Sequence, residues 1–231
     1  PLIQTFDITD GSKKILWQCK APYYEYLVKM IDPAKLTFIT ARESQKEITN
    51  YYLHTTVKKK PTEKLLTSFT NPYTKLEGVS RQKITYKRDD GVSLSGNLYL
   101  PKGYDAARDG KLPVLIWAYP IEYKSASDAS QVRGSKNTFT RPFYGSPVLW
   151  VTRGYAVLDN AEMPIVGVNG NEPNDNFIPQ LYLNAHAAIQ ALDSMGVGDS
   201  TRVAVGGHSY GAFMTANLLA HTNLFKAGIA R

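Results

Sequence analysis

The sequence has one cysteine, few histidines and no long hydrophobic run. Cys19 stands alone, which excludes an internal disulfide and any metal site built from several cysteines. No stretch approaches the roughly 18 apolar residues of a membrane-spanning helix, so we expect no membrane partner. Residues 1–4 lack both a methionine and a charged-then-apolar signal region. We therefore expect that any targeting segment has already been removed.

The charge balance does not single out a nucleic-acid partner. Lys and Arg number 27 against 20 Asp and Glu, which gives a net charge of +7. These cations are scattered, apart from residues 58–60, which precede Pro61 in an expected turn. Such a run is typical of a solvated loop, so we expect no nucleic-acid binding. The length suits one large domain, or one domain with part of another.

Residues 1–75 read as short strands separated by turns. Three β-rich segments, 15–19, 35–41 and 51–56, are punctuated by turn-forming dipeptides such as Asp10–Gly11. This is enough chain for about one and a half propeller blades, whereas a propeller needs about 4 to 8. If these are propeller strands, they form the end of a larger β domain.

From residue 76 the pattern changes to alternating strands and helices. Residues 83–86 and 92–100 suit a hairpin whose second strand is a half-covered edge, and residues 113–118 suit a buried parallel strand. Apolar residues recur at helical spacing over 175–195. We also expect a short helix over 146–153 and strands over 155–158 and 225–230. This alternation predicts a doubly wound α/β sheet with mostly parallel strands.

The pentapeptide 207–211 carries the clearest chemistry, because it has the form Gly-x-Ser-x-Gly. An apolar strand segment precedes it and a helix-forming segment, 212–220, follows it. That order predicts the nucleophile elbow of an α/β-hydrolase, with Ser209 exposed at the apex. The next backbone N–H, that of Tyr210, would donate a hydrogen bond to an oxyanion.

The partners that activate such a serine are missing from the sequence. In this fold an acid and then a histidine follow the serine, but no Asp or Glu follows Ser209. His208 lies inside the turn, and His221 lies about 18 Å further along the expected helix. His54 and His186 both precede the serine. Either the chain is a fragment of a longer catalytic unit, which its stop in mid-fold favours, or it binds without catalysing.

The chain resembles the prolyl oligopeptidase family of serine peptidases, and within it the glutamyl endopeptidase branch. The resemblance rests on the elbow at 206–214, the opening hairpin at 84–101, and the segments 117–120, 131–135 and 216–221. It covers the whole chain and is strong from residue 113 onwards. It implies a β-propeller that caps an α/β-hydrolase domain, with peptides cleaved between them.

This resemblance assigns expected roles along the chain. Residues 1–75 would be the last propeller strands and residues 76–231 the N-terminal portion of the catalytic domain, with the Asp and His beyond Arg231. Relatives supply a second oxyanion donor from a tyrosine at the place of Tyr119. Here Pro120 follows instead of a Gly-containing turn, so a packing role for this tyrosine is the alternative.

Cleavage after glutamate would require a cation in the specificity pocket. Arg133 is the candidate, in a loop on the active-site side of the sheet, with a solvated loop arginine as the alternative. We expect no metal and no other cofactor, because no histidine–carboxylate cluster and no phosphate-binding glycine loop stand in the sequence.

The predicted function is therefore hydrolysis of peptide or protein substrates through an acyl-enzyme, with two alternatives. One is an esterase or acyl hydrolase, because the same elbow serves both chemistries. The other is an inactive peptide-binding protein, in which aromatic residues such as Tyr23, Tyr24 and Tyr26 would hold the ligand. Relatives with removed signals favour a periplasmic or extracellular location over the cytoplasm, and the oligomeric state is open.

Overall fold

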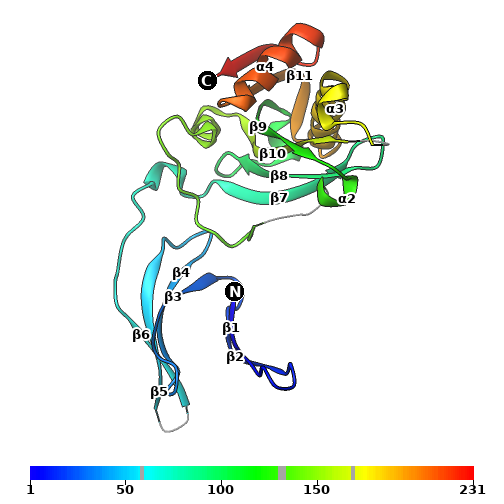
Figure 1. Ribbon diagram of the computed structural model, residues 1–231. Helices are drawn as coiled ribbons and strands as arrows, with labels where there is room; N and C mark the ends of the chain where they lie inside the picture. Colours follow the sequence, from blue (N-terminus) through cyan, green and yellow to red (C-terminus); the bar gives the residue numbers. More distant parts are fainter. Residues whose placement is uncertain (58–59, 130–133, 168–169) are drawn as a thin grey trace. The chain divides into compact units, whose positions relative to one another are not determined.

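The structure, a computed structural model, describes residues 1–57, 60–129, 134–167 and 170–231 (Figure 1). Their contacts divide the chain into two compact units. Unit 1 consists of Pro1–Thr74 with Gly134–Arg141, and unit 2 of Lys75–Arg133 with Pro142–Arg231.

Unit 1 consists of antiparallel strands. Its two-stranded and four-stranded sheets follow chain order, with strands β1 Leu2–Phe6, β2 Lys13–Gln18, β3 Tyr24–Asp32, β4 Thr37–Glu43, β5 Asn50–Val57 and β6 Lys60–Leu65. The three segments expected to be strands correspond to β2, β4 and β5. In their core the ring of Phe38 stacks on His54, with centroids 4.6 Å apart, and the edge of Trp17 meets both rings.

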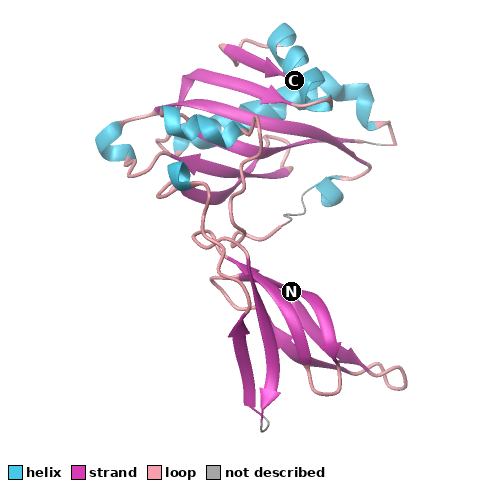
Figure 2. Ribbon diagram, turned by 90° about the vertical axis from the view of Figure 1, so that its left-hand side faces the viewer, coloured by secondary structure: helices cyan, strands magenta, loops and turns pink. Residues whose placement is uncertain are grey.

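Unit 2 is built on a six-stranded sheet with the order β12-β11-β9-β10-β8-β7 (Figure 2). The strands are β7 Ser80–Lys87, β8 Ser93–Leu100, β9 Leu112–Tyr123, β10 Ala156–Val166, β11 Gly198–Gly207 and β12 Ala227–Ala230. Strand β8 is antiparallel to its two neighbours, β7 and β10, and the pairs that join β10, β9, β11 and β12 are parallel. This sheet confirms the predicted α/β class.

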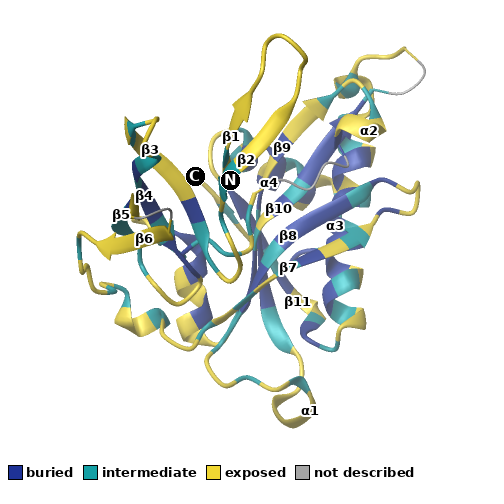
Figure 3. Ribbon diagram, turned by 90° about the horizontal axis from the view of Figure 1, so that it is seen from below, coloured by how far each residue is buried: buried dark blue, intermediate teal, exposed yellow. Residues whose placement is uncertain are grey.

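Helices cover both faces of this sheet. Helices α3 (Phe177–Ser194) and α4 (Tyr210–His221) pack on one face, in the largest hydrophobic core of the molecule. The 3-10 helix η2 (Pro147–Arg153) packs on the other face, against Leu115 and Val157. Strand β10 is accordingly buried along most of its length, whereas the second half of β9 is partly exposed (Figure 3). The remaining short elements are η1 Thr74–Leu76, α1 Ala106–Asp109, α2 Ala126–Ala129 and η3 Pro173–Asn176.

Several expected elements of unit 2 differ in detail from the structure. The hairpin is confirmed, but its second strand is not an edge: β8 lies between β7 and β10, with Leu94 and Leu98 buried. Strand β10 runs eight residues beyond the predicted strand, through a bulge at Asn160, whose φ is 51°. The helix expected over 175–195 is preceded by η3 and begins at Phe177.

None of the helices in the described ranges is long and apolar enough to cross a membrane.

Candidate functional site

Ser209 lies in the sharp turn between β11 and α4. Its backbone has φ 55° and ψ −115°, a positive-φ conformation that is rare for a residue with a side chain. Strain of this kind persists only where the surroundings enforce it, and it concentrates at functional sites. The residue is exposed, at the carboxyl end of β11, a parallel strand that lies between β12 and β9. This is where ligands bind in open α/β sheets.

Two glycines allow this turn to form. A Cβ placed on Gly207 or on Gly211 would lie 2.5 Å from the carbonyl oxygen of Ala118 in β9. The same atom on Gly207 would lie 2.6 Å from Gly211 itself. Backbone cannot yield as a flexible side chain can, so the Gly-x-Ser-x-Gly pattern is a packing requirement where α4 meets β9 and β11.

The backbone N–H of Tyr210 is the first of helix α4. Such N–H groups have no acceptor within their own helix, and the Ser209 side chain does not cap them. They also lie at the positive end of the helix dipole, where negative charge is stabilised. The turn therefore places a hydroxyl next to an N–H group that can donate to a developing oxyanion.

Tyr119 lies at the same turn. A Cβ on Gly211 would be 3.8 Å from the Cα of Tyr119, and the ring of Tyr119 meets that of Tyr210 edge to face, with centroids 5.9 Å apart. Tyr119 is 52% exposed, so the residue is not part of the buried core. The structure thus brings Ser209, Tyr210 and Tyr119 together, while their catalytic roles stay predictions.

An aromatic group, which we call the elbow aromatic cluster, surrounds the Tyr210 side chain. Its members are Tyr119, Phe177, Tyr210 and Phe213, and the rings of Phe177 and Phe213 lie 5.6 and 5.9 Å from that of Tyr210. The Tyr210 hydroxyl donates to Oε1 of Glu122 over 2.9 Å. Burial and this carboxylate raise the pKa of Tyr210 to about 12.

Sequence reasoning missed three members of this arrangement: Phe177, Phe213 and Glu122. Helical spacing after the serine could have flagged Phe213, which follows it by one turn. No sequence signal brings residue 122 to residue 210.

A base for the serine is not found in the described ranges. No histidine there is hydrogen-bonded to Ser209: His54 bonds Glu25 in unit 1, and His186 bonds Gln190 on α3. His221 stands at the far end of α4. Arg133, predicted to bind substrate, lies outside the described residues.

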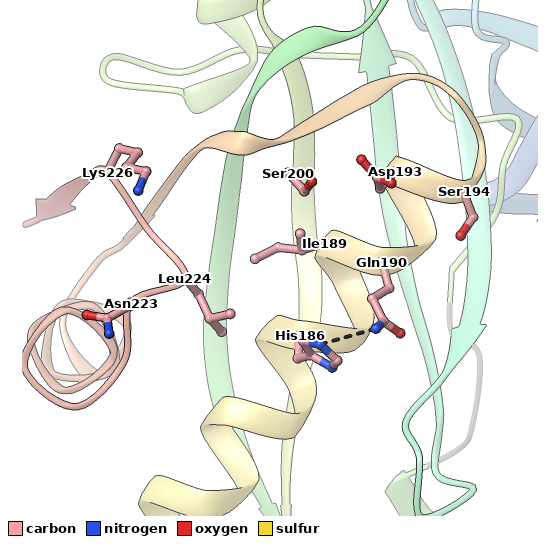
Figure 4. A pocket seen from close by; sticks show the side chains of 9 residues that line it. All are labelled: His186, Ile189, Gln190, Asp193, Ser194, Ser200, Asn223, Leu224 and Lys226. Carbon is pink, nitrogen blue, oxygen red and sulfur yellow. Dashed lines mark hydrogen bonds between the residues drawn. The ribbon is translucent and has the colours of Figure 1, made fainter.

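A groove of about 580 Å³ opens at the opposite end of the sheet (Figure 4). It is lined by side chains of α3, by Ser200 in the first half of β11 and by Lys226 just before β12. At about 3.3 Å per residue, Ser200 lies roughly 30 Å along the strand from Ser209. This groove is therefore separate from the serine turn.

One cluster in unit 1 has donor atoms close enough to hold a metal ion. The candidate ligand atoms of Glu25, His54 and Glu63 all lie within 4.8 Å of one another. However, Arg42 donates to both carboxylates, at 2.8 Å to Glu25 Oε2 and 2.7 Å to Glu63 Oε1. Burial opposes ionisation of Glu25, but hydrogen bonds from His54 and Arg42 lower its pKa to about 2. The donor set thus fits an ion-pair network, because the Arg42 guanidinium already pairs with both carboxylates.

The elbow region is similar to a known protein family. Residues 182–231, from α3 to the end of the chain, match the model of the prolyl oligopeptidase family.

Two curated relatives match the whole chain. The chain is 45% identical to an Oryza sativa subsp. japonica protein and 43% identical to an Arabidopsis thaliana protein, both named probable glutamyl endopeptidase, chloroplastic. It spans 26% and 25% of their respective lengths.

Among solved structures, Pyrococcus horikoshii acylaminoacyl peptidase aligns over 96% of this chain and 32% of its own, with a TM-score of 0.56 at 19% identity. This likeness concerns the fold alone, and it supports the predicted α/β-hydrolase architecture. Together the matches confirm the resemblance seen in the sequence: residues 182–231 match the prolyl oligopeptidase family, and the whole chain is similar to about a quarter of two proteins named as glutamyl endopeptidases.

Proposed function

We propose that the full-length protein containing this chain is a serine peptidase and that Ser209 is its nucleophile. The observation that carries the proposal is the positive-φ conformation of Ser209 at the carboxyl end of β11, exposed and next to the first N–H of α4. The relatives named as glutamyl endopeptidases support the same reaction class.

The proposed reaction has two steps. In the first, Ser209 Oγ bonds to the carbonyl carbon of the scissile peptide bond, the C–N bond breaks, and the hydroxyl proton passes through a base to the leaving amine. In the second, water attacks the carbonyl carbon of the acyl-enzyme and loses a proton to the same base. The ester C–O bond then breaks, and the base returns the proton to Ser209 Oγ as the new carboxylic acid leaves. The Tyr210 N–H and the Tyr119 hydroxyl would stabilise the oxyanion in both steps.

The base and its orienting acid would come from a part of the full-length protein outside this chain. The fraction of its relatives that the chain spans supports this, since about three quarters of their length lies elsewhere. We likewise propose that the strands of residues 1–75 end a β-propeller that caps the catalytic domain. The antiparallel four-stranded sheet β3-β4-β5-β6, in chain order, has the strand number of one blade.

The relatives' names also support a preference for glutamate at the cleaved bond. Arg133 stays a candidate for the cation that this preference needs. Replacing it in the full-length enzyme by Arg133→Ala should reduce the preference for Glu over Gln, and an unchanged preference would remove it from consideration.

The location of the protein is also a proposal. The names of the two plant relatives place those proteins in the chloroplast. For this chain we keep a periplasmic or extracellular location as the proposal. The absence of a membrane-spanning helix in the described ranges does not choose between these compartments.

Steady-state hydrolysis by the full-length protein tests the proposed function. Peptides with a single glutamate should be cleaved, and Ser209→Ala should lower kcat by at least about 10³-fold. The matched control is Ser200→Ala, the same change on β11 at the other end of the sheet, which should leave kcat unchanged. Cleavage of simple esters without any cleavage of peptides would favour the acyl-hydrolase alternative. Hydrolysis that survives Ser209→Ala would contradict the assignment of the nucleophile.

A further inference from the structure

Arg231 is held directly beside the serine turn. The backbone N–H of Ser209 donates to the Arg231 carbonyl oxygen over 2.8 Å, and the N–H of Arg231 donates to the carbonyl of Gly207 over 3.1 Å. These two bonds extend the pairing of β11 with β12 by one residue. The arginine is therefore at the carboxyl end of the sheet, where the proposed chemistry takes place.

Arg231 directly follows β12, and its side chain lies on the face of the sheet opposite α4. Ile229, two residues earlier, packs in the core beneath η2, whereas a Cβ on Gly228 would meet side chains of α4. Because side chains alternate along a strand, Arg231 shares the η2 face with Ile229. Its guanidinium thus lies over the loop that leads into η2.

Three residues of that loop position the guanidinium. A Cβ on Gly145 would lie 2.5 Å from Nη1 of Arg231, so the group occupies the space that a side chain at this position would fill. Gly145 itself has φ 76°. The Cζ atom of Arg231 is 6.0 and 5.9 Å from the ring centroids of Phe143 and Tyr144, close enough for cation–π attraction.

The charge of Arg231 is available to a ligand. Five other arginines in the described ranges are paired with carboxylates, namely Arg42, Arg88, Arg108, Arg141 and Arg202. Across the ranges that the structure describes, no carboxylate forms an ion pair with Arg231, and the residue is exposed. A guanidinium is a planar fork of N–H donors that matches a carboxylate in geometry as well as in charge.

We propose that Arg231 determines specificity by binding the side-chain carboxylate of the substrate residue whose carbonyl Ser209 attacks. This inference rests on the proposed function and names a second arginine, besides Arg133, that would give the enzyme an acidic preference. Glu122, a carboxylate near the end of β9, accepts a hydrogen bond from the Tyr210 hydroxyl and forms no ion pair with Arg231 in the described ranges.

The test compares two matched peptides that differ only in Glu or Gln at the cleaved bond. In the full-length protein, Arg231→Met should lower the Glu-to-Gln ratio of kcat/KM by about 10- to 100-fold, the range expected for loss of a charge-assisted hydrogen bond. Cleavage of the Gln peptide should stay within about threefold of the unmodified protein, and Arg231→Lys should retain part of the preference. The control is Arg202→Met, which removes the same charge from a residue paired with Asp199 in the first half of β11.

A second variant tests the position of the Arg231 guanidinium without removing its charge. Gly145→Ala keeps Arg231 but places a methyl group where the guanidinium lies, so it should also lower the ratio. A ratio that stays unchanged in Arg231→Met would overturn the proposal, as would an equal loss on both peptides. If the unmodified protein cleaves neither peptide, the proposed function fails first, and the role of Arg231 fails with it.

Discussion

The hydroxyl of Tyr210 donates a hydrogen bond to the carboxylate of Glu122, and the two oxygen atoms are 2.9 Å apart. Tyr210 opens helix α4, whereas Glu122 lies near the end of β9. The bond therefore connects the side chain of Tyr210, the proposed oxyanion donor, to β9, the strand that also contains Tyr119. Burial and the Glu122 carboxylate raise the pKa of Tyr210 to about 12, so its hydroxyl keeps the donated proton well above neutral pH.

Removing this bond should affect catalysis only modestly. Tyr210→Phe leaves the backbone N–H in place and keeps the ring contacts with Phe177 and Phe213. We therefore expect kcat/KM of the full-length protein to fall less than about tenfold, because one neutral-to-charged hydrogen bond is lost outside the reacting atoms. Tyr182→Phe, on α3 against His186, provides the matched control. A loss above about a hundredfold in Tyr210→Phe would mean that the hydroxyl itself takes part in the reaction.

Tyr119 should behave differently from Tyr210. If its hydroxyl donates to the oxyanion, Tyr119→Phe should lower kcat by about 10²- to 10³-fold with little change in KM. The reason is that the bond would form in the transition state and not in the ground state. Steady-state kinetics on one peptide measures both constants. A kcat equal to that of the unmodified protein would assign Tyr119 to packing.

The sequence predicted the elements whose patterns are local. The elbow could be read from Gly207, Ser209 and Gly211, because each glycine meets a backbone that leaves no room for a Cβ. The core-facing side of α3 likewise followed from the spacing of Leu181 and Ala185, which are both buried.

Other features depended on contacts between distant residues. Strand β3 lacks a clear pattern because most of its side chains are exposed at the edge of its sheet. The pairing of Glu122 with Tyr210 and the placement of Arg231 over Gly145 join segments more than eighty residues apart. No periodicity in the sequence encodes such pairs, since they arise only when the sheet assembles.

The close contact at Gly211 predicts a loss of stability on substitution. Gly211→Ala would place a methyl group 2.5 Å from the Ala118 carbonyl oxygen, which belongs to a buried strand and cannot move freely. We expect the free energy of unfolding to fall by about 1–3 kcal/mol or more. Gly228→Ala is the comparison, because its methyl would meet the tip of the exposed Leu219 side chain, and it should cost less. Equal urea-unfolding midpoints for the two variants would contradict this packing argument.

Asp159 predicts a pH dependence of stability. Burial raises the pKa of its carboxyl from 3.8 to about 6, so the folded state binds more protons than the unfolded state between these values. The contribution of Asp159 to stability is therefore present below about pH 4 and is lost as the pH rises through about 6. At about 1.4 kcal/mol per pKa unit, Asp159→Asn should stabilise the protein by about 2–3 kcal/mol at pH 7. Unfolding midpoints that change identically between pH 4 and 7 in both proteins would exclude this role for Asp159.

The most direct test of the account is the intact mass of the natural protein before and after treatment with a fluorophosphonate. This probe reacts with activated serines, so it reports on the nucleophile without any assumption about the substrate. We expect a species much heavier than the 25.7 kDa of this chain that gains one adduct, and we expect Ser209→Ala to abolish that adduct. A natural protein that gains no adduct, or one that still gains it after Ser209→Ala, would contradict the assignment of Ser209 as the nucleophile.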